Sequence, residues 1–149
     1  STVVVDPVSG DDGRAYVSAE LIAAWPRLLA RATWALPNLT EVELFTGQTG
    51  EAAVAALRAR WPELKLIVTG WPAGDDVVTR LYDGPGEGEE HRQARVAGSP
   101  SGTGDLFAAD WMREVFLRGA MPAVAMARAA EAVARALRAG GVGTALGGV

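Results

Sequence analysis

The residues best suited to chemistry lie in a glycine-rich segment, Gly102-Thr103-Gly104-Asp105. It joins a loop to the predicted start of a helix, where unpaired backbone amides and the helix dipole favour a bound anion. The segment is not a Walker loop, because no Gly-Lys-Ser or Gly-Lys-Thr occurs in the chain. It is not the dinucleotide fingerprint either, because Phe107 stands where the third glycine would be. Spacing alone leaves two interpretations open, a phosphate-binding loop and a glycine turn capped by Asp105.

Asp105 has two interpretations of its own. A carboxylate in the first turn of a helix is commonly present because the helix dipole stabilises it. The alternative is a general base beside a bound phosphate, which accepts the proton of a substrate hydroxyl as the phosphoryl group is transferred.

Polar side chains follow several predicted strands. Asp6, Asn38 and Thr69 each come directly after, or at the end of, an apolar run. Ligands of an open parallel sheet bind beyond the carboxyl ends of its strands, so these side chains are candidates for a site. The segments beside them carry further carboxylates, which would need a cation such as Mg²⁺ to tolerate a phosphate: Asp11, Asp12, Glu41 and Glu43. Mg²⁺ prefers one or two carboxylates with phosphate oxygens and water. For Asp12 and Glu43 the simpler expectation is solvated surface charge.

Other chemistry-bearing residues are isolated. His91 is the single histidine and there is no cysteine, so a zinc site is excluded and a strand histidine is expected. Trp25 and Trp61 fall on apolar helix stripes, whereas Trp71 follows a strand end and could flank a ligand. Asp110 is expected to face solvent.

The elements that must position these residues alternate between strands and helices. The apolar pattern predicts strands at 3–5, 34–36 and 64–69 and a hairpin of 77–82 with 91–96 around a polar, mobile loop at 83–90. It predicts helices at 18–32, 51–61, 105–117 and 122–138. A further short helix would begin with a capping box of Thr40 and Glu43 and end at Gly47. This alternation predicts an α/β fold with a mostly parallel sheet and helices on both faces.

Composition is consistent with one globular domain. The chain has 149 residues, of which 49% are hydrophobic and 21% charged, with 14 basic against 18 acidic residues. The net charge of −4 argues against a nucleic-acid partner. No apolar run approaches the length of a membrane span, and the first residues lack the basic start of a signal peptide. We therefore expect a cytoplasmic protein without a membrane partner.

Several motifs occur in order from about residue 3 to residue 119: Asp6-Pro7-Val8 with Gly10-Asp11, Tyr16-Val17, the segment 37–44 with Thr46-Gly47, Val68-Thr69, and the segment 102–109. Together they resemble the pyridoxal kinases of the ribokinase-like superfamily. The related hydroxymethylpyrimidine kinases share the Asp-Pro-Val and Pro-Asn pieces but typically have cysteine where Asp105 stands. Two positions depart from the pattern: Leu36 replaces a threonine and Gly70 replaces a polar residue.

The resemblance implies a ribokinase-like enzyme that transfers the γ-phosphate of ATP to the 5'-hydroxyl of pyridoxal, pyridoxine or pyridoxamine. It implies ATP and Mg²⁺ as cofactors, a monovalent cation such as K⁺ as an optional one, and a homodimer. Because the family has considerably longer chains, residues 1–149 would be its C-terminal, ATP-binding and catalytic part, without the N-terminal substrate half.

The resemblance also implies roles for single residues. Asp105 would be the catalytic base and would touch the substrate, with an anion hole formed by Gly102, Thr103 and Gly104. The residues implied to lie beside the Mg²⁺ ion are Asp6, Glu41 and Tyr16. The residues implied to bind or border ATP are Asp6, Asn38, Thr69, His91, Arg92, Gln93, Ala94 and Thr103.

Two alternatives stay open at this point. The substrate could instead be hydroxymethylpyrimidine. The chain could also be a nucleotide-binding module that is inactive without its N-terminal half, or whose missing half comes from another chain.

Overall fold

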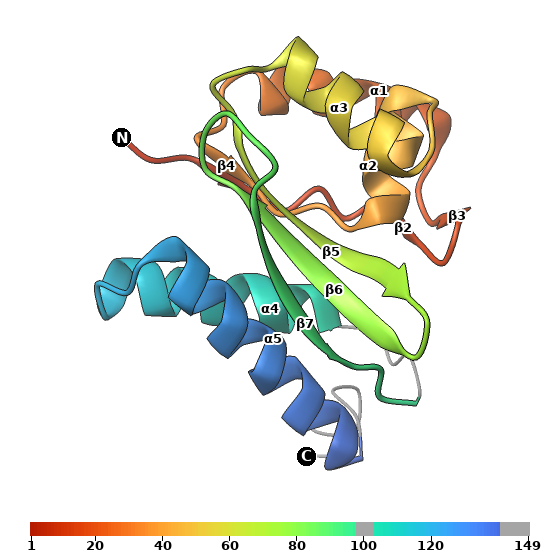
Figure 1. Cartoon of the computed structure of the whole chain (residues 1–149). Helices are drawn as coiled ribbons and strands as arrows, with labels where there is room; N and C mark the ends of the chain where they lie inside the picture. Colours follow the sequence, from red (N-terminus) through yellow and green to blue (C-terminus); the bar gives the residue numbers. More distant parts are fainter. Residues whose placement is uncertain (98–102, 141–149) are drawn as a thin grey trace. The chain divides into compact units, whose positions relative to one another are not determined.

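A computed structural model describes residues 1–97 and 103–140 of the chain (Figure 1). The chain folds into two compact units. The first is formed by Ser1–Trp71 and Tyr82–Gly88, and the second by Pro72–Leu81 and the chain from Glu89 onward. No helix in the described ranges is both long and apolar enough to cross a membrane.

The first unit is built on parallel strands. β1 (Val4–Val5) pairs with β4 (Trp34–Ala35), and β4 pairs with β5 (Lys65–Ala73), with Val4 opposite Trp34 and Trp34 opposite Lys65. The centre of β5 is fully buried, since Leu66, Ile67 and Val68 have no exposed surface. A continuous apolar run is what a parallel strand covered on both faces requires. The parallel pairing confirms the predicted α/β class.

Three helices accompany these strands: α1 (Ala19–Leu29), α2 (Leu39–Thr46) and α3 (Gly50–Arg60). Ser18 caps α1 by accepting a hydrogen bond from the amide of Leu21. Gly47 ends α2 in the left-handed conformation with φ of 69°, which glycine adopts without steric cost.

The capping box of α2 lies two residues earlier than the sequence analysis placed it. The side chain of Asn38 accepts from the amide of Glu41 at 2.9 Å, and the carboxylate of Glu41 accepts from the amide of Asn38 at 3.0 Å. The prediction of Thr40 and Glu43 was therefore wrong, because asparagine caps a helix as well as threonine does and the helix already begins at Leu39.

A small hairpin lies between β1 and α1. β2 (Gly10–Asp11) and β3 (Arg14–Ala15) pair antiparallel through a two-residue turn. Asp12 and Gly13 have φ of 47° and 73°, the left-handed pair that twists a tight hairpin correctly. Thr40 does not cap α2; its hydroxyl instead accepts a hydrogen bond from the amide of Gly13 at 3.0 Å.

The polar loop that follows β6 (Asp76–Tyr82) has two attachments in the first unit. Arg58 of α3 donates to the carbonyls of Gly84 and Gly86 at 2.9 and 2.8 Å. Its guanidinium also lies 4.5 Å from the ring centre of Tyr82. Lys65 forms an ion pair of 2.9 Å with Asp83.

The second unit combines a hairpin with a helix pair. β6 pairs antiparallel with β7 (Glu89–Ala94), and Thr79 lies opposite His91. α4 (Thr103–Met112) passes directly into a π-helix, η1 (Arg113–Leu117), and α5 (Pro122–Arg138) follows after a short turn. The helix predicted at 105–117 thus begins at Thr103 and changes hydrogen-bond pattern at Arg113. The core between these helices contains Trp111 at 0% exposure and Ala125 and Ala129 of α5, also at 0%.

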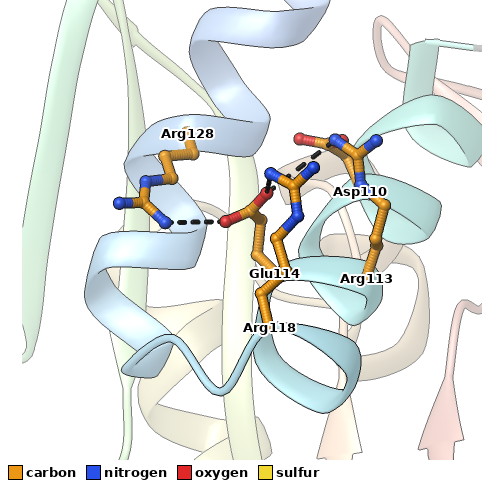
Figure 2. A network of polar contacts seen from close by, with 5 residues as sticks. All are labelled: Asp110, Arg113, Glu114, Arg118 and Arg128. Carbon is orange, nitrogen blue, oxygen red and sulfur yellow. Dashed lines mark hydrogen bonds and ion pairs between the residues drawn. The ribbon is translucent and has the colours of Figure 1, made fainter.

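A buried carboxylate joins η1 to α5. Glu114 is 2% exposed, and its two oxygens accept from Arg118 and Arg128, each at 2.7 Å (Figure 2). Asp110, expected to face solvent, instead has a side chain only 12% exposed that is ion-paired with Arg113. That expectation was wrong because the Asp110 side chain is largely buried and pairs with Arg113, three residues further along the helix.

Candidate active site

Glu41 is the centre of the polar cluster in the first unit. Only 4% of it is exposed, and its oxygens accept from the amides of Ser9 at 2.8 Å and Asn38 at 3.0 Å. Burial is the main cause that raises the pKa of Glu41 to about 7; backbone hydrogen bonds from Ser9 and Asn38 oppose the shift, and the charge of Asp6 adds to it. Through these two hydrogen bonds, Glu41 links the segment before β2 to the start of α2.

Asn38 and Thr69 lie beside this carboxylate. The amide group of Asn38 donates to the carbonyl of Gly10 at 2.7 Å. Asn38 and Thr69 form an isolated parallel bridge, and the Thr69 amide donates to the carbonyl of Pro37 at 3.1 Å. The structure thus brings together Asn38 and Thr69, which the sequence analysis placed at strand ends, and Glu41 from the segment beside them.

Asp6 and Tyr16 complete the cluster from the chain on either side of the hairpin. Asp6 is half-buried directly after β1 and is close enough to Glu41 to influence its ionisation. Tyr16 is 67% exposed, and its amide donates to the carbonyl of Ser9 at 2.7 Å. Slight burial, and then the charges of Asp11 and Asp12, raise the pKa of the Tyr16 phenol.

This cluster suits a magnesium ion that arrives with a nucleotide better than a metal held by protein alone. The described residues contain no group of three or more histidine, cysteine or acidic side chains placed to hold a metal. Asp6 and Glu41 supply two carboxylates, and a carboxylate oxygen that accepts one amide can still accept another ligand. Mg²⁺ commonly uses one or two carboxylates and takes its other ligands from phosphate and water.

The second unit presents Asp105 to solvent. Thr103, Gly104 and Asp105 form the first turn of α4, where the backbone amides are free of helical partners, and Asp105 is exposed. A Cβ at Gly104 would meet nothing within 4 Å among the described atoms, so crowding does not require glycine there. Gly102 lies outside the described residues.

A pocket of about 390 Å³ lies between β7 and α5, lined by His91, Arg92, Gln93, Glu131, Ala134, Arg135 and Arg138. Gln93 donates to the carbonyl of Ala130 at 3.1 Å, which anchors the strand to the helix. His91 Nε2 lies 3.3 Å from the side-chain oxygen of Gln93. Three arginines against one glutamate give the pocket a positive charge suited to an anion.

The pocket includes three of the residues that the sequence analysis linked to ATP and adds four that it missed. Ala94, at the end of β7, is exposed and does not line it. The missed residues are on α5 at positions 131, 134, 135 and 138, a spacing that places them on one helix face. That spacing was the signal in the sequence from which a shared helix face could have been predicted. Trp71, considered as a ligand-flanking residue, is buried at 7% exposure.

Comparisons with solved structures identify the class of fold. No family profile matches the chain. Solved structures superpose well on it: pyridoxal kinase from Entamoeba histolytica has a TM-score of 0.84 at 22% identity, covering 93% of this chain and 52% of that one. Pyridoxal kinase from Lactobacillus plantarum has a TM-score of 0.80 at 30% identity, covering 93% and 53%. The chain has the ribokinase-like α/β fold.

Comparison with curated sequences shows which proteins the chain resembles in sequence. The chain is 37% identical over 151 residues to a pyridoxine/pyridoxal/pyridoxamine kinase of Bordetella bronchiseptica, covering 91% of this chain and 51% of the relative. The corresponding kinase of Bordetella pertussis is 37% identical over 123 residues, covering 72% and 41%. The chain is a relative of the pyridoxal kinases and spans about half the length of the curated relatives that it matches.

Proposed function

We propose that this chain forms the nucleotide-binding and catalytic part of a kinase that phosphorylates the 5'-hydroxyl of pyridoxal, pyridoxine and pyridoxamine with ATP. The observation that carries the proposal is the 37% identity over 151 residues to the Bordetella bronchiseptica kinase. The ribokinase-like fold supports it, as does an aspartate rather than a cysteine at position 105.

In the proposed reaction Asp105 is the general base. The substrate oxygen forms a bond to the γ-phosphorus, its proton passes to the Asp105 carboxylate, and the bond from the γ-phosphorus to the bridging oxygen breaks to release ADP. The exposed position of Asp105 in the first turn of α4 supports this role. The amides of Gly102, Thr103 and Gly104 would stabilise the negative charge of the transferring group.

The first unit would supply the metal and phosphate edge. Asp6 and Glu41 would hold Mg²⁺, with Tyr16 beside them and Asn38 and Thr69 toward the nucleotide. When bound, Mg²⁺ neutralises charge on the phosphate oxygens. A monovalent cation such as K⁺ stays an additional option implied by the resemblance.

The pocket between β7 and α5 would border the nucleotide. Its positive charge supports an anionic ligand, and His91, Arg92 and Gln93 line it together with four residues of α5. Ala94 and Thr103 would complete the nucleotide border. Two related structures contain nucleotides: the Leishmania donovani pyridoxal kinase in complex with ADP and pyridoxine, and the Plasmodium falciparum PdxK with AMP-PNP.

The test is formation of the 5'-phosphate by the isolated chain with ATP, Mg²⁺ and pyridoxal. Asp105→Asn should lower turnover by roughly two or more decades, the range seen on removal of a general base, while ATP binding survives. Asp75→Asn, an exposed carboxylate in the β5–β6 turn, is the matched control and should leave turnover unchanged. Equal turnover of Asp105→Asn and the unmodified chain would remove Asp105 from the mechanism.

A second candidate follows from the length of the relatives. Because the chain spans about half of them, it can be a nucleotide-binding module without turnover of its own. Absence of product, with ATP still raising the melting temperature, would select that candidate. Competition between pyridoxal and hydroxymethylpyrimidine tests the choice of substrate, and light scattering tests the implied homodimer.

A further inference from the structure

The helix side of the pocket between β7 and α5 has two arginines without a counterion. Arg135 and Arg138 are exposed, line the pocket, and pair with no carboxylate among the described residues. Glu131 lies four residues before Arg135 and also lines the pocket, yet the two form no ion pair in the described part of the chain. Like charges three residues apart on a helix repel each other, and a bound anion would relieve that repulsion.

The strand side of the pocket has a histidine whose ring orientation is fixed by a neighbour. Gln93 donates from its amide nitrogen to the carbonyl of Ala130 at 3.1 Å, so its amide oxygen is directed to His91 Nε2 at 3.3 Å. This contact assigns the hydrogen of a neutral His91 ring to Nε2 and leaves Nδ1 as an acceptor. A second proton would turn Nδ1 into a donor and give the ring a positive charge, a change that histidine ordinarily undergoes between pH 8 and pH 5.

The charged groups near His91 come from three elements. On α5, the two arginines disfavour a positive ring when no anion is bound, and Glu131 favours it. On β7, Arg92 also lines the pocket, but it pairs with Asp76 of β6 at 3.4 Å. Thr79 of β6, which lies opposite His91, is uncharged. A dianion in the pocket would attract the arginines and a protonated ring together, so its binding and the protonation of His91 would strengthen each other.

We propose that this pocket binds the phosphate group of a small organic molecule, which Arg135 and Arg138 hold while a protonated His91 adds a further donor. Guanidinium groups match phosphate oxygens in both charge and hydrogen-bond geometry. The volume of about 390 Å³ lies in the range of small-molecule sites, roughly 300 to 1,000 Å³, and leaves room for more than a free phosphate. The inference rests on the proposed function only for the identity of the ligand, which is either the nucleotide or a separate phosphorylated molecule.

The test uses sulfate, a tetrahedral dianion whose charge is the same at pH 6 and pH 8. The chain is titrated with sodium sulfate at constant ionic strength, and sodium acetate is the planar monoanion for comparison. His91 is the single histidine of the chain, so its ring signals in the proton NMR spectrum report on the pocket together with the amide signals of β7 and α5. Sulfate should shift these signals and bind at least roughly 5-fold more tightly at pH 6 than at pH 8, the lower end of ordinary coupling between two equilibria.

Substitutions separate the two contributions to binding. Arg135→Gln with Arg138→Gln should weaken sulfate binding by roughly 10-fold or more, because two charged donors are lost. His91→Gln should give the weaker affinity of pH 8 at both pH values, because glutamine does not ionise. The matched control, Arg27→Gln with Arg31→Gln, removes two exposed arginines of the first unit and should leave sulfate binding unchanged. Circular dichroism checks that each variant remains folded.

Competition identifies the source of the phosphate. Displacement of sulfate by ATP but not by adenosine assigns the pocket to the nucleotide, whereas sulfate and ATP bound together assign it to a separate phosphorylated molecule. Three results would overturn the proposal: sulfate binding no tighter than acetate binding, affinity that is the same at both pH values, or full affinity in the double arginine variant of the pocket. A chain that binds sulfate as expected without phosphorylating pyridoxal would overturn the proposed function alone.

Discussion

At the scale of single residues, Glu41 joins two segments of the first unit through its hydrogen bonds and has a strongly raised pKa. It is buried, it accepts amides from two segments, and its pKa is raised to about 7. The free energy of its ionisation therefore changes when the chain unfolds, because the unfolded carboxyl returns to an ordinary pKa near 4.5.

This shift predicts how stability changes with pH. The folded state holds the Glu41 proton more tightly than the unfolded state, so the contribution to stability is fully present below pH 4.5 and is lost as pH rises through about 7. In buffer without divalent cations, the free energy of unfolding should fall by up to about 3 kcal/mol between pH 5 and pH 8, at roughly 1.4 kcal/mol for each pKa unit.

Urea unfolding at a series of pH values measures this slope. Glu41→Gln should flatten it, because glutamine does not ionise, and should also lower stability at pH 5 because its amide group opposes a backbone donor. Glu63→Gln, at an exposed carboxylate, is the control and should retain the slope. Stability of the unmodified chain that rises across this range would contradict the shift.

Part of this cluster was predictable from the sequence. Asn38 and Thr69 could be placed at one sheet edge because parallel strands bring their carboxyl ends together, and the bridge between them agrees with that expectation. The capping role of Glu41 was not predictable, because two overlapping motifs, Asn38 to Glu41 and Thr40 to Glu43, fit the same rule. The conformation of the backbone at the start of α2 selects the first motif, and the local sequence does not determine that conformation.

At the scale of elements, the junction of α4 with α5 depends on the buried Glu114. Its neighbours Arg118 and Arg128 are more than half exposed, so the arginines cover the carboxylate while their own charge remains solvated (Figure 2). The hydrogen bond from Arg128 holds the pKa of Glu114 below its usual range, with Arg118 and Arg113 adding to the effect. The periodicity at 105–117 predicted a helix correctly but could not distinguish the π-helical turn, since an apolar stripe looks alike in both.

We expect Glu114→Ala to lower the melting temperature by several degrees. The substitution leaves three arginines near one another without the carboxylate that separates them. Glu114→Gln should lower it less, because the amide oxygen still accepts one hydrogen bond. Glu87→Ala, in an exposed loop, is the control for the loss of one negative charge.

The acid dependence gives an independent check on the same junction. Because the folded pKa of Glu114 is lowered, its contribution is present above pH 4.5 and is lost as pH falls through the lower folded value. The difference in melting temperature between Glu114→Gln and the unmodified chain should therefore shrink in acid. A difference that stays constant down to acid pH would mean that ionisation of Glu114 does not stabilise the junction.

At the scale of the whole molecule, composition and size are consistent with one globular domain, and the comparisons show that the chain spans about half the length of the curated relatives that it matches. A chain of 149 residues can form a core by itself, so length alone gave no reason to expect relatives about twice as long. The motifs did give that reason, because they match a family with longer chains. The assignment to the C-terminal part of that family stays a prediction.

A ligand that binds only the folded chain shifts the equilibrium between the folded and unfolded states. A bound nucleotide should therefore raise the melting temperature of the chain. Binding at 100 times the dissociation constant corresponds to about 2.7 kcal/mol of stabilisation. If the arginine-lined pocket contributes to the nucleotide site, ATP should raise the melting temperature more than adenosine, which lacks the phosphates. Arg135→Gln with Arg138→Gln should reduce the ATP shift toward the adenosine value.

The control is Arg27→Gln, which removes an exposed positive charge near the end of α1 in the first unit and should leave the ATP shift unchanged. Differential scanning fluorimetry over a range of ATP concentrations separates a change in affinity from a change in the stability of the free chain. A full ATP shift in the double variant would exclude Arg135 and Arg138 from nucleotide binding. The roles proposed for Asp105, Asp6 and Glu41 would be untouched by that result, because they rest on other residues and on the turnover assay.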